Sequence, residues 1–171
     1  MSENNIYNGT FVLGDVSATT LSAGEGIKIT TDEPGVIKVS NDETVLWSGA
    51  MDNIPSTATL SESYKNFETI KIYAKTEDQY NCTVTEYPNN TDYFNILIHQ
   101  AWPGTNTAYW DKSVTMQPNN DYTKISACFS TLNRFASGNS VSVSFRTTST
   151  TGSSWVRPFK IVGINRISGG N

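Results

Sequence analysis

The residues best suited to ligand chemistry in this 171-residue chain gather in one segment, residues 100–111. Two tryptophans, a tyrosine, an amide and a carboxylate surround its Trp-Pro-Gly turn: Trp102, Asn106, Tyr109, Trp110 and Asp111. Carbohydrate sites combine an aromatic ring, which stacks on the apolar face of a sugar, with polar groups that bind its hydroxyls. These five residues are the predicted carbohydrate-binding site. In the alternative interpretation, one or both tryptophans pack in the core or at a subunit interface.

Acid–base catalysis finds weaker support in the sequence. Glycoside hydrolysis needs two carboxylates about 5 to 9 Å apart, and the candidates here fall in turns or at polar strand positions, where solvent surrounds them. They are Glu62, Glu68, Asp92 and Asp111. The single histidine, His99, has no carboxylate or nucleophile near it in the sequence. We therefore predict no catalytic residues and a protein that is not an enzyme.

Metal and cofactor chemistry also lacks ligands. One histidine and two widely separated cysteines, Cys82 and Cys128, do not supply a tetrahedral zinc site. No metal site and no cofactor are predicted. Because nothing indicates an oxidising compartment, we expect two buried free thiols, with a disulfide as the alternative.

Charge and composition narrow the class of partner. The net charge is −4 and no basic run occurs, so we predict no nucleic-acid binding. No apolar segment is long enough to cross a membrane, and the Met-Ser-Glu-Asn-Asn start has neither region of a signal peptide. We expect a full gene product, beginning at Met1, that assembles in the cytoplasm without membrane insertion.

Alternating apolar and polar residues predict the elements that would position these side chains. An abundance of Ser, Thr and Asn disfavours helix, and only residues 62–67 are expected to form a short helical turn. Predicted strands cover residues 44–49, 58–61, 70–75, 81–87, 94–99, 125–129, 141–145 and 155–167. The last has apolar residues on both faces, which is typical of a central or interface-facing strand. The pattern predicts an all-β, antiparallel, jelly-roll-like β-sandwich.

A repeat of ten residues precedes this domain. Gly26-Ile27-Lys28-Ile29-Thr30 is echoed by Val36-Ile37-Lys38-Val39-Ser40, and each copy alternates apolar and polar positions. Two short strands cannot bury their apolar edges alone, because an isolated hairpin is marginal in water. The repeat therefore predicts a multimeric stalk, in which neighbouring chains cover each other.

The order of several motifs resembles bacteriophage fibre proteins. Residues 19–29 fit the pattern Leu-x-x-Gly-x-Gly-apolar-x-apolar, which is similar to the repeat of trimeric viral fibre shafts. Val45-Leu46-Trp47-Ser48-Gly49, Ala58-Thr59-Leu60-Ser61, residues 66–72 and residues 159–164 are similar, in that order, to the terminal domains of phage fibre and tail proteins.

The resemblance implies a homotrimer located in the virion. Residues 1–20 would be an attachment arm that docks on a phage capsid or tail protein, 21–43 a short trimeric β-stalk and 44–171 the β-sandwich knob. Trimerisation would bury four side chains near the threefold axis: Ile27, Ile29, Ile37 and Val39. Two repeats make a short shaft, which favours a capsid-attached head fibre that adheres to glycans. The alternatives are a tail-fibre or spike receptor-binding protein, or a carbohydrate-binding module for host surface glycans.

Overall fold

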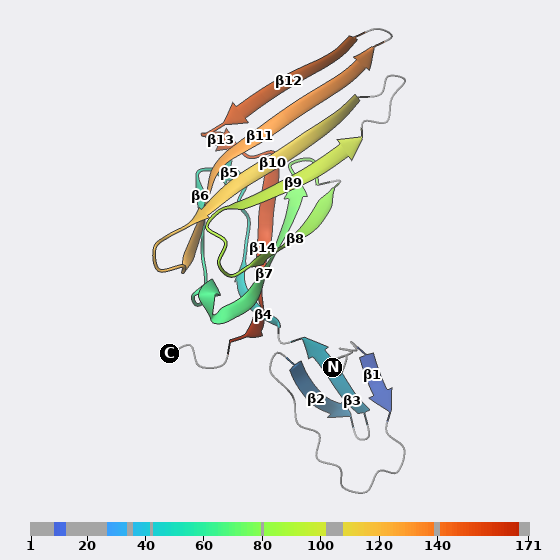
Figure 1. The fold of residues 1–171 in the computed structure, drawn as a ribbon, viewed down its shortest axis with the longest axis vertical. Helices are drawn as coiled ribbons and strands as arrows, with labels where there is room; N and C mark the ends of the chain where they lie inside the picture. The colour runs from blue at the N-terminus through green and yellow to red at the C-terminus, as the bar shows by residue number, and fades with distance from the viewer. Residues whose placement is uncertain are drawn as a thin grey trace, which may run out of the picture.

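The protein is all-β, as the sequence predicts. The computed structural model describes the backbone of residues 9–12, 27–33, 36–41, 43–79, 81–101, 108–138 and 141–167. It describes the side chains of residues 43–79, 81–100, 109–134 and 147–167. Figure 1 shows two antiparallel sheets that face each other, with a small third sheet beyond one end of this sandwich.

The first large sheet is a meander. Its strands are β9 (Phe94–Ala101), β10 (Ala108–Pro118), β11 (Lys124–Gly138) and β12 (Val141–Ser149), each paired antiparallel with the next along the chain. The short strand β6 (Ser56–Thr59) pairs with the start of β11. Because these four consecutive strands stay in one sheet, the connectivity differs from the two Greek keys of a jelly roll.

The second large sheet brings together distant parts of the chain. Its order is β4 (Glu43–Ser48), β14 (Val156–Arg166), β7 (Phe67–Thr76) and β8 (Cys82–Pro88). β14 lies between β4 and β7, which confirms the prediction of a central C-terminal strand. A two-stranded pair, β5 (Asn53–Ile54) with β13 (Gly152–Ser153), completes the sandwich.

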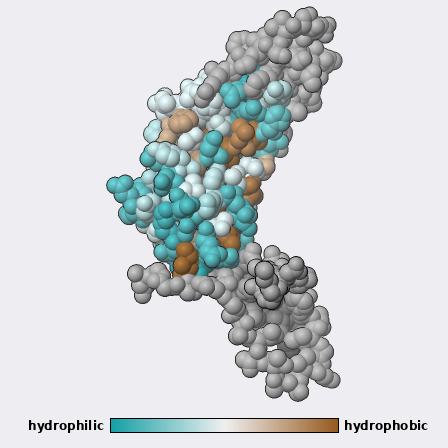
Figure 2. Space-filling view, viewed as in Figure 1, coloured by the Kyte–Doolittle hydropathy of each residue, from teal (hydrophilic) through white to brown (hydrophobic). Residues whose placement is uncertain are grey.

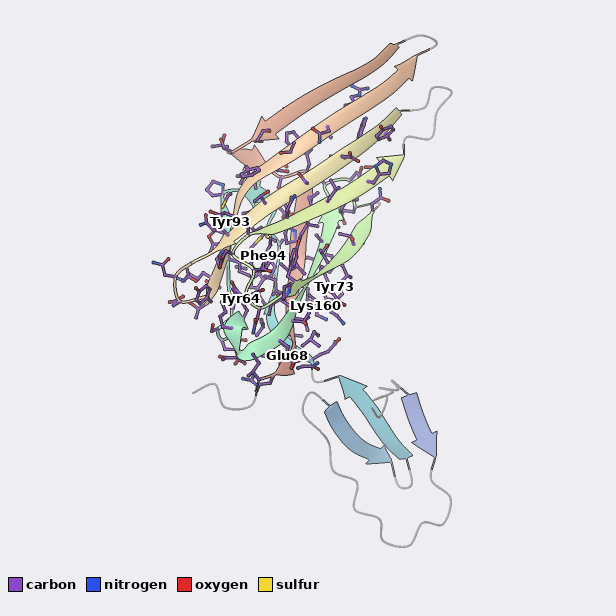
Figure 3. The ribbon with its side chains drawn as sticks, in the orientation of Figure 1. Tyr64, Glu68, Tyr73, Tyr93, Phe94 and Lys160 are labelled. Atoms are coloured by element: carbon purple, nitrogen blue, oxygen red, sulfur yellow. The ribbon has the colours of Figure 1, made fainter. Side chains whose placement is uncertain are left out.

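The expected short helical turn is a 3₁₀ helix, Tyr64–Asn66, at one end of the core. The Ser63 side chain caps it by accepting a hydrogen bond from the Lys65 amide. The buried Tyr64 ring packs edge-on against the Phe94 ring, with 5.6 Å between the ring centroids. Both residues are labelled in Figure 3. Burial raises the pKa of the Tyr64 hydroxyl to about 12, and the hydroxyl donates to the Thr91 carbonyl.

Strand alternation fills the space between the sheets. Phe94, Ile96 and Ile98 of β9 are buried, whereas Leu97 between them and Tyr93 just before them are exposed. Gly163 of β14 lies under the Phe67 ring, where a Cβ atom would stand 2.4 Å from a ring carbon. Only glycine permits that close approach. Trp47 is partly buried and packs against the core, and Trp155 is also partly buried.

The third sheet contains the repeat. β2 (Ile27–Glu33) and β3 (Val36–Asn41) pair antiparallel as two strands, and β1 (Gly9–Val12) adds to β3 on the other side. β1 thus falls within the range predicted as the attachment arm. The register aligns apolar with apolar positions, Ile29 with Val39 and Ile37 with Phe11. It also aligns polar Lys28 with Ser40.

The two cysteines are free, as expected, but neither of them is fully buried. Cys82 is exposed on the edge strand β8, and Cys128 is partly buried in β11. The alternation around Cys82 indicates a strand correctly; it does not reveal that this side of β8 faces outward.

Candidate functional site

The predicted carbohydrate-binding residues are divided between two faces of one strand. Tyr109, Trp110 and Asp111 begin β10, while Trp102 and Asn106 lie outside the described residues. Successive side chains of a strand point to opposite faces. Tyr109 and Asp111 therefore share the outer face of the first sheet, and Trp110 lies on the inner face with Lys112.

On the outer face, Asp111 is paired with His99. The two residues are register partners on β10 and β9, and His99 Nδ1 lies 2.6 Å from Asp111 Oδ1. An ionised carboxylate can only accept, so Nδ1–H donates and Nε2 is left for another partner. The His99 side chain is 61% exposed. The centroid of its ring also lies 5.0 Å from the centroid of the Tyr109 ring, and Tyr109 is 40% exposed.

Sequence reasoning did not find the carboxylate beside His99. Asp111 is twelve positions away, across the segment of residues 102–107. The signal was present, however, because a hairpin centred on that turn-forming segment places residue 99 opposite residue 111. Two titratable groups and an aromatic ring thus form one exposed cluster, with hydrogen-bonding atoms for hydroxyls and a ring face for stacking.

The same outer face carries exposed apolar side chains. Tyr93 is 60% exposed, Leu97 54% and Phe129 36%. Figure 2 shows hydrophobic residues gathered on this face, over β9 to β11, among hydrophilic surroundings. The outer face therefore combines apolar area with the His99–Asp111 pair.

On the inner face, Lys112 is a buried charge. Its side chain is 1% exposed, and its Nζ lies 3.0 Å from Glu77 Oε1 and 3.2 Å from Asp78 Oδ2. Both carboxylates come from the turn after β7 in the opposite sheet. The Glu77 and Asp78 side chains are 29% and 27% exposed, so they are partly withdrawn from solvent. A buried ammonium group requires ionic partners, and this turn supplies them.

Further contacts order this inner cluster. Gln100 Nε2 donates to Asp78 Oδ2 at 3.2 Å, and the Thr76 hydroxyl donates to Asp78 Oδ1. The Trp110 ring lies between two cations, 5.1 Å from Lys112 Nζ and 5.6 Å from Arg134 Cζ. Trp110 is partly buried at this inner position.

The other candidate acids for catalysis have structural partners. Glu62 forms a two-pronged ion pair with Arg166 at 2.6 and 2.7 Å, and these hydrogen bonds hold the pKa of Glu62 below its usual value. Glu68, labelled in Figure 3, accepts from Asn165 at 3.0 Å. A carboxylate stabilised in its ionised form is a poor general acid. Asp92 is exposed.

The described part of the chain also bears on metal binding and on membrane insertion. No group of three His, Cys, Asp or Glu side chains there is arranged to hold a metal ion. None of the described helices is long and apolar enough to span a membrane.

Comparison with known proteins gives no relatives. No family model matches the chain, and neither a curated protein nor a solved structure matches it.

Proposed function

We propose that this chain is a structural component of a bacteriophage virion, a short homotrimeric fibre attached to the capsid. The observation that carries the proposal is the separate sheet β1–β3–β2, which lies beyond one end of the sandwich (Figure 1). The phage-fibre resemblance of the motifs in residues 19–29 and 45–72 supports the same interpretation.

The register of the small sheet favours association of copies. Ile29 pairs with Val39, and Ile37 pairs with Phe11, so apolar positions are grouped across the strands. Cross-strand partners lie on the same face of an antiparallel sheet. Burying such side chains contributes about 1.5–3 kcal/mol each, and two further copies of the chain would provide the cover.

Substitutions in the small sheet test the trimer. Ile29→Asp and Val39→Asp should each convert a trimer to monomers, because a carboxylate at the axis would be desolvated without a partner. Lys28→Asp is the matched control, since Lys28 pairs with the polar Ser40. Sedimentation equilibrium reports the oligomeric state. Intact trimers for both Ile29→Asp and Val39→Asp would contradict the proposal.

Attachment to the particle is tested separately. Immunogold electron microscopy of virions should place the protein on the capsid. Label on the tail would instead support the tail-fibre or spike alternative, and unlabelled particles would contradict a virion component.

A second function, glycan adhesion, is favoured by the exposed His99–Asp111 pair beside the Tyr109 ring. Tyr109→Ala and Asp111→Asn should each abolish binding on a glycan array. Tyr93→Ala is the matched control, because Tyr93 is an exposed tyrosine on the same outer face. Binding that survives both site substitutions, or that is absent from the unmodified chain, excludes this site.

A further inference from the structure

We propose that Lys112 and Asp78 form an intramolecular isopeptide bond, with Glu77 transferring the protons. The bond would join β10 of one sheet to the turn after β7 of the other. It would tie the two halves of the sandwich covalently, independently of whether the chain forms a fibre.

The reacting groups are already in contact, and the attacking amine is shielded from water. Nζ of Lys112 lies 3.2 Å from Asp78 Oδ2, and the lysine side chain is 1% exposed. Attack requires the neutral amine, which Glu77 can generate by accepting a proton from Lys112 Nζ across 3.0 Å. Low water content also favours condensation over the reverse hydrolysis.

Glu77 is positioned to move the protons. Its Oε1 lies 3.0 Å from Lys112 Nζ. Its Oε2 is buried and has no hydrogen-bond partner among the described residues, so that oxygen can hold a proton in transit. A carboxyl group at this distance is within reach for general acid–base catalysis.

Two donors fix the carboxyl group that is attacked. The Thr76 hydroxyl donates to Asp78 Oδ1, and Gln100 Nε2 donates to Asp78 Oδ2. Negative charge builds on these oxygens when the amine adds to Cγ. Donors already in place stabilise that charge, as in an oxyanion hole.

The step balances without a further reactant. Glu77 first carries one proton from the Lys112 ammonium group to the Asp78 carboxylate, which gives an amine and a carboxylic acid. Nζ then bonds to Cγ, Glu77 takes a second proton from nitrogen, and Oδ2 leaves with it as water. Oδ1 remains as the amide carbonyl, and nothing is oxidised or reduced.

Mass spectrometry of the intact purified chain tests the bond. Its mass should be lower than the sequence mass, corrected for any loss of Met1, by one water molecule. Trypsin should fail to cut after the acylated Lys112, so a single peptide of residues 76–124 should appear, also one water lighter. A full sequence mass, or release of separate peptides 76–112 and 113–124, would overturn the proposal.

Variants separate the chemistry from folding. Lys112→Arg retains the cation but should show the full sequence mass, and Glu77→Gln should remain unlinked while the far-ultraviolet spectrum stays native. The matched control is Lys71→Arg, because Lys71 also bridges two carboxylates, Glu43 and Glu86, on the outer face. It should remain one water lighter than its sequence. A water-depleted mass in Lys112→Arg would exclude this lysine, and one in Glu77→Gln would exclude the proton-transfer role.

Discussion

Two lysines of this protein each bridge two carboxylates, yet their surroundings differ. Lys71 lies on the outer face of the second sheet, 3.3 Å from Glu43 and 3.4 Å from Glu86, with 20% of its side chain exposed. Lys112 lies between the sheets, 3.0 Å from Glu77 and 3.2 Å from Asp78, with 1% exposed. The ion-pair distances are nearly equal, so the comparison isolates the effect of solvent.

Solvent decides what such a cluster can do. Water and salt screen the outer pairs, and a screened pair contributes little to stability. Between the sheets, the Lys112 ammonium group depends on its two carboxylates, since water cannot replace them. The buried cluster is therefore both a structural requirement and a place where condensation chemistry becomes feasible.

Removing each lysine should give the largest contrast. Lys112→Met leaves two carboxylates facing the space between the sheets and should lower the free energy of unfolding by about 3–5 kcal/mol. Lys71→Met should lower it by less than about 1 kcal/mol. Urea unfolding followed by fluorescence measures both. Equal losses would show that burial does not distinguish the clusters.

Two contacts between a cation and an aromatic ring extend the comparison, and their expected effects on the free energy of unfolding are smaller. Trp110→Leu removes a ring that lies between two cations and should cost about 2 kcal/mol. On the outer face of the second sheet, Lys160 Nζ lies 5.0 Å from the Tyr73 ring, the pair labelled in Figure 3. Tyr73→Leu should cost only about 0.5–1 kcal/mol, because this contact is partly solvated. The same urea titrations test the pair, and a larger loss for Tyr73→Leu would contradict the ranking.

The strands were more predictable than the contacts between them. Alternation located β7, β9 and β14, because a strand buried on one face repeats every second residue. It could not show that Lys112, at an inner position of β10, meets a turn more than thirty residues earlier in the chain. Such a contact depends on how the two sheets face each other, and local sequence does not record that.

The candidate carbohydrate-binding cluster was predictable only in part, because its contacts also depend on how the strands pair. Tyr109 and Asp111 were identified from their residue types, and alternation alone would have separated them from Trp110. The pairing of Asp111 with His99 required the hairpin register across residues 102–107. The register of two paired strands depends on both the turn that joins them and the face that is buried. Residue types by themselves therefore did not reveal which residue lies opposite Asp111.

High salt should reduce the stability loss caused by Lys71→Met but not the loss caused by Lys112→Met, and this effect is of intermediate size. In about 1 M NaCl the Debye length falls to about 3 Å, so most of the loss caused by Lys71→Met should disappear. The loss caused by Lys112→Met should persist, because ions do not enter between the sheets. Urea titrations of both variants at low and high salt measure this. A salt-sensitive Lys112→Met loss would indicate that solvent reaches the inner cluster.

Alkaline pH should produce the smallest of these effects on stability, through Lys71. Burial lowers the pKa of Lys71, but the hydrogen bond to Glu43 and the charges of Glu43 and Glu86 outweigh it, so the net pKa lies above the ordinary 10.5. A lysine whose folded pKa is raised contributes stability that is fully present below the unfolded pKa and is lost as pH rises through the folded pKa.

The difference between the unmodified chain and Lys71→Met should therefore be constant up to about pH 10 and then shrink by a few tenths of a kcal/mol by about pH 11. The double substitution Glu43→Gln with Glu86→Gln should abolish this pH dependence, because it removes the two groups that raise the pKa. Urea unfolding at pH steps across this range measures both. If the difference instead grows with pH, the pKa of Lys71 is lowered on folding, and its burial then outweighs its carboxylates, which would make the outer cluster resemble the inner one.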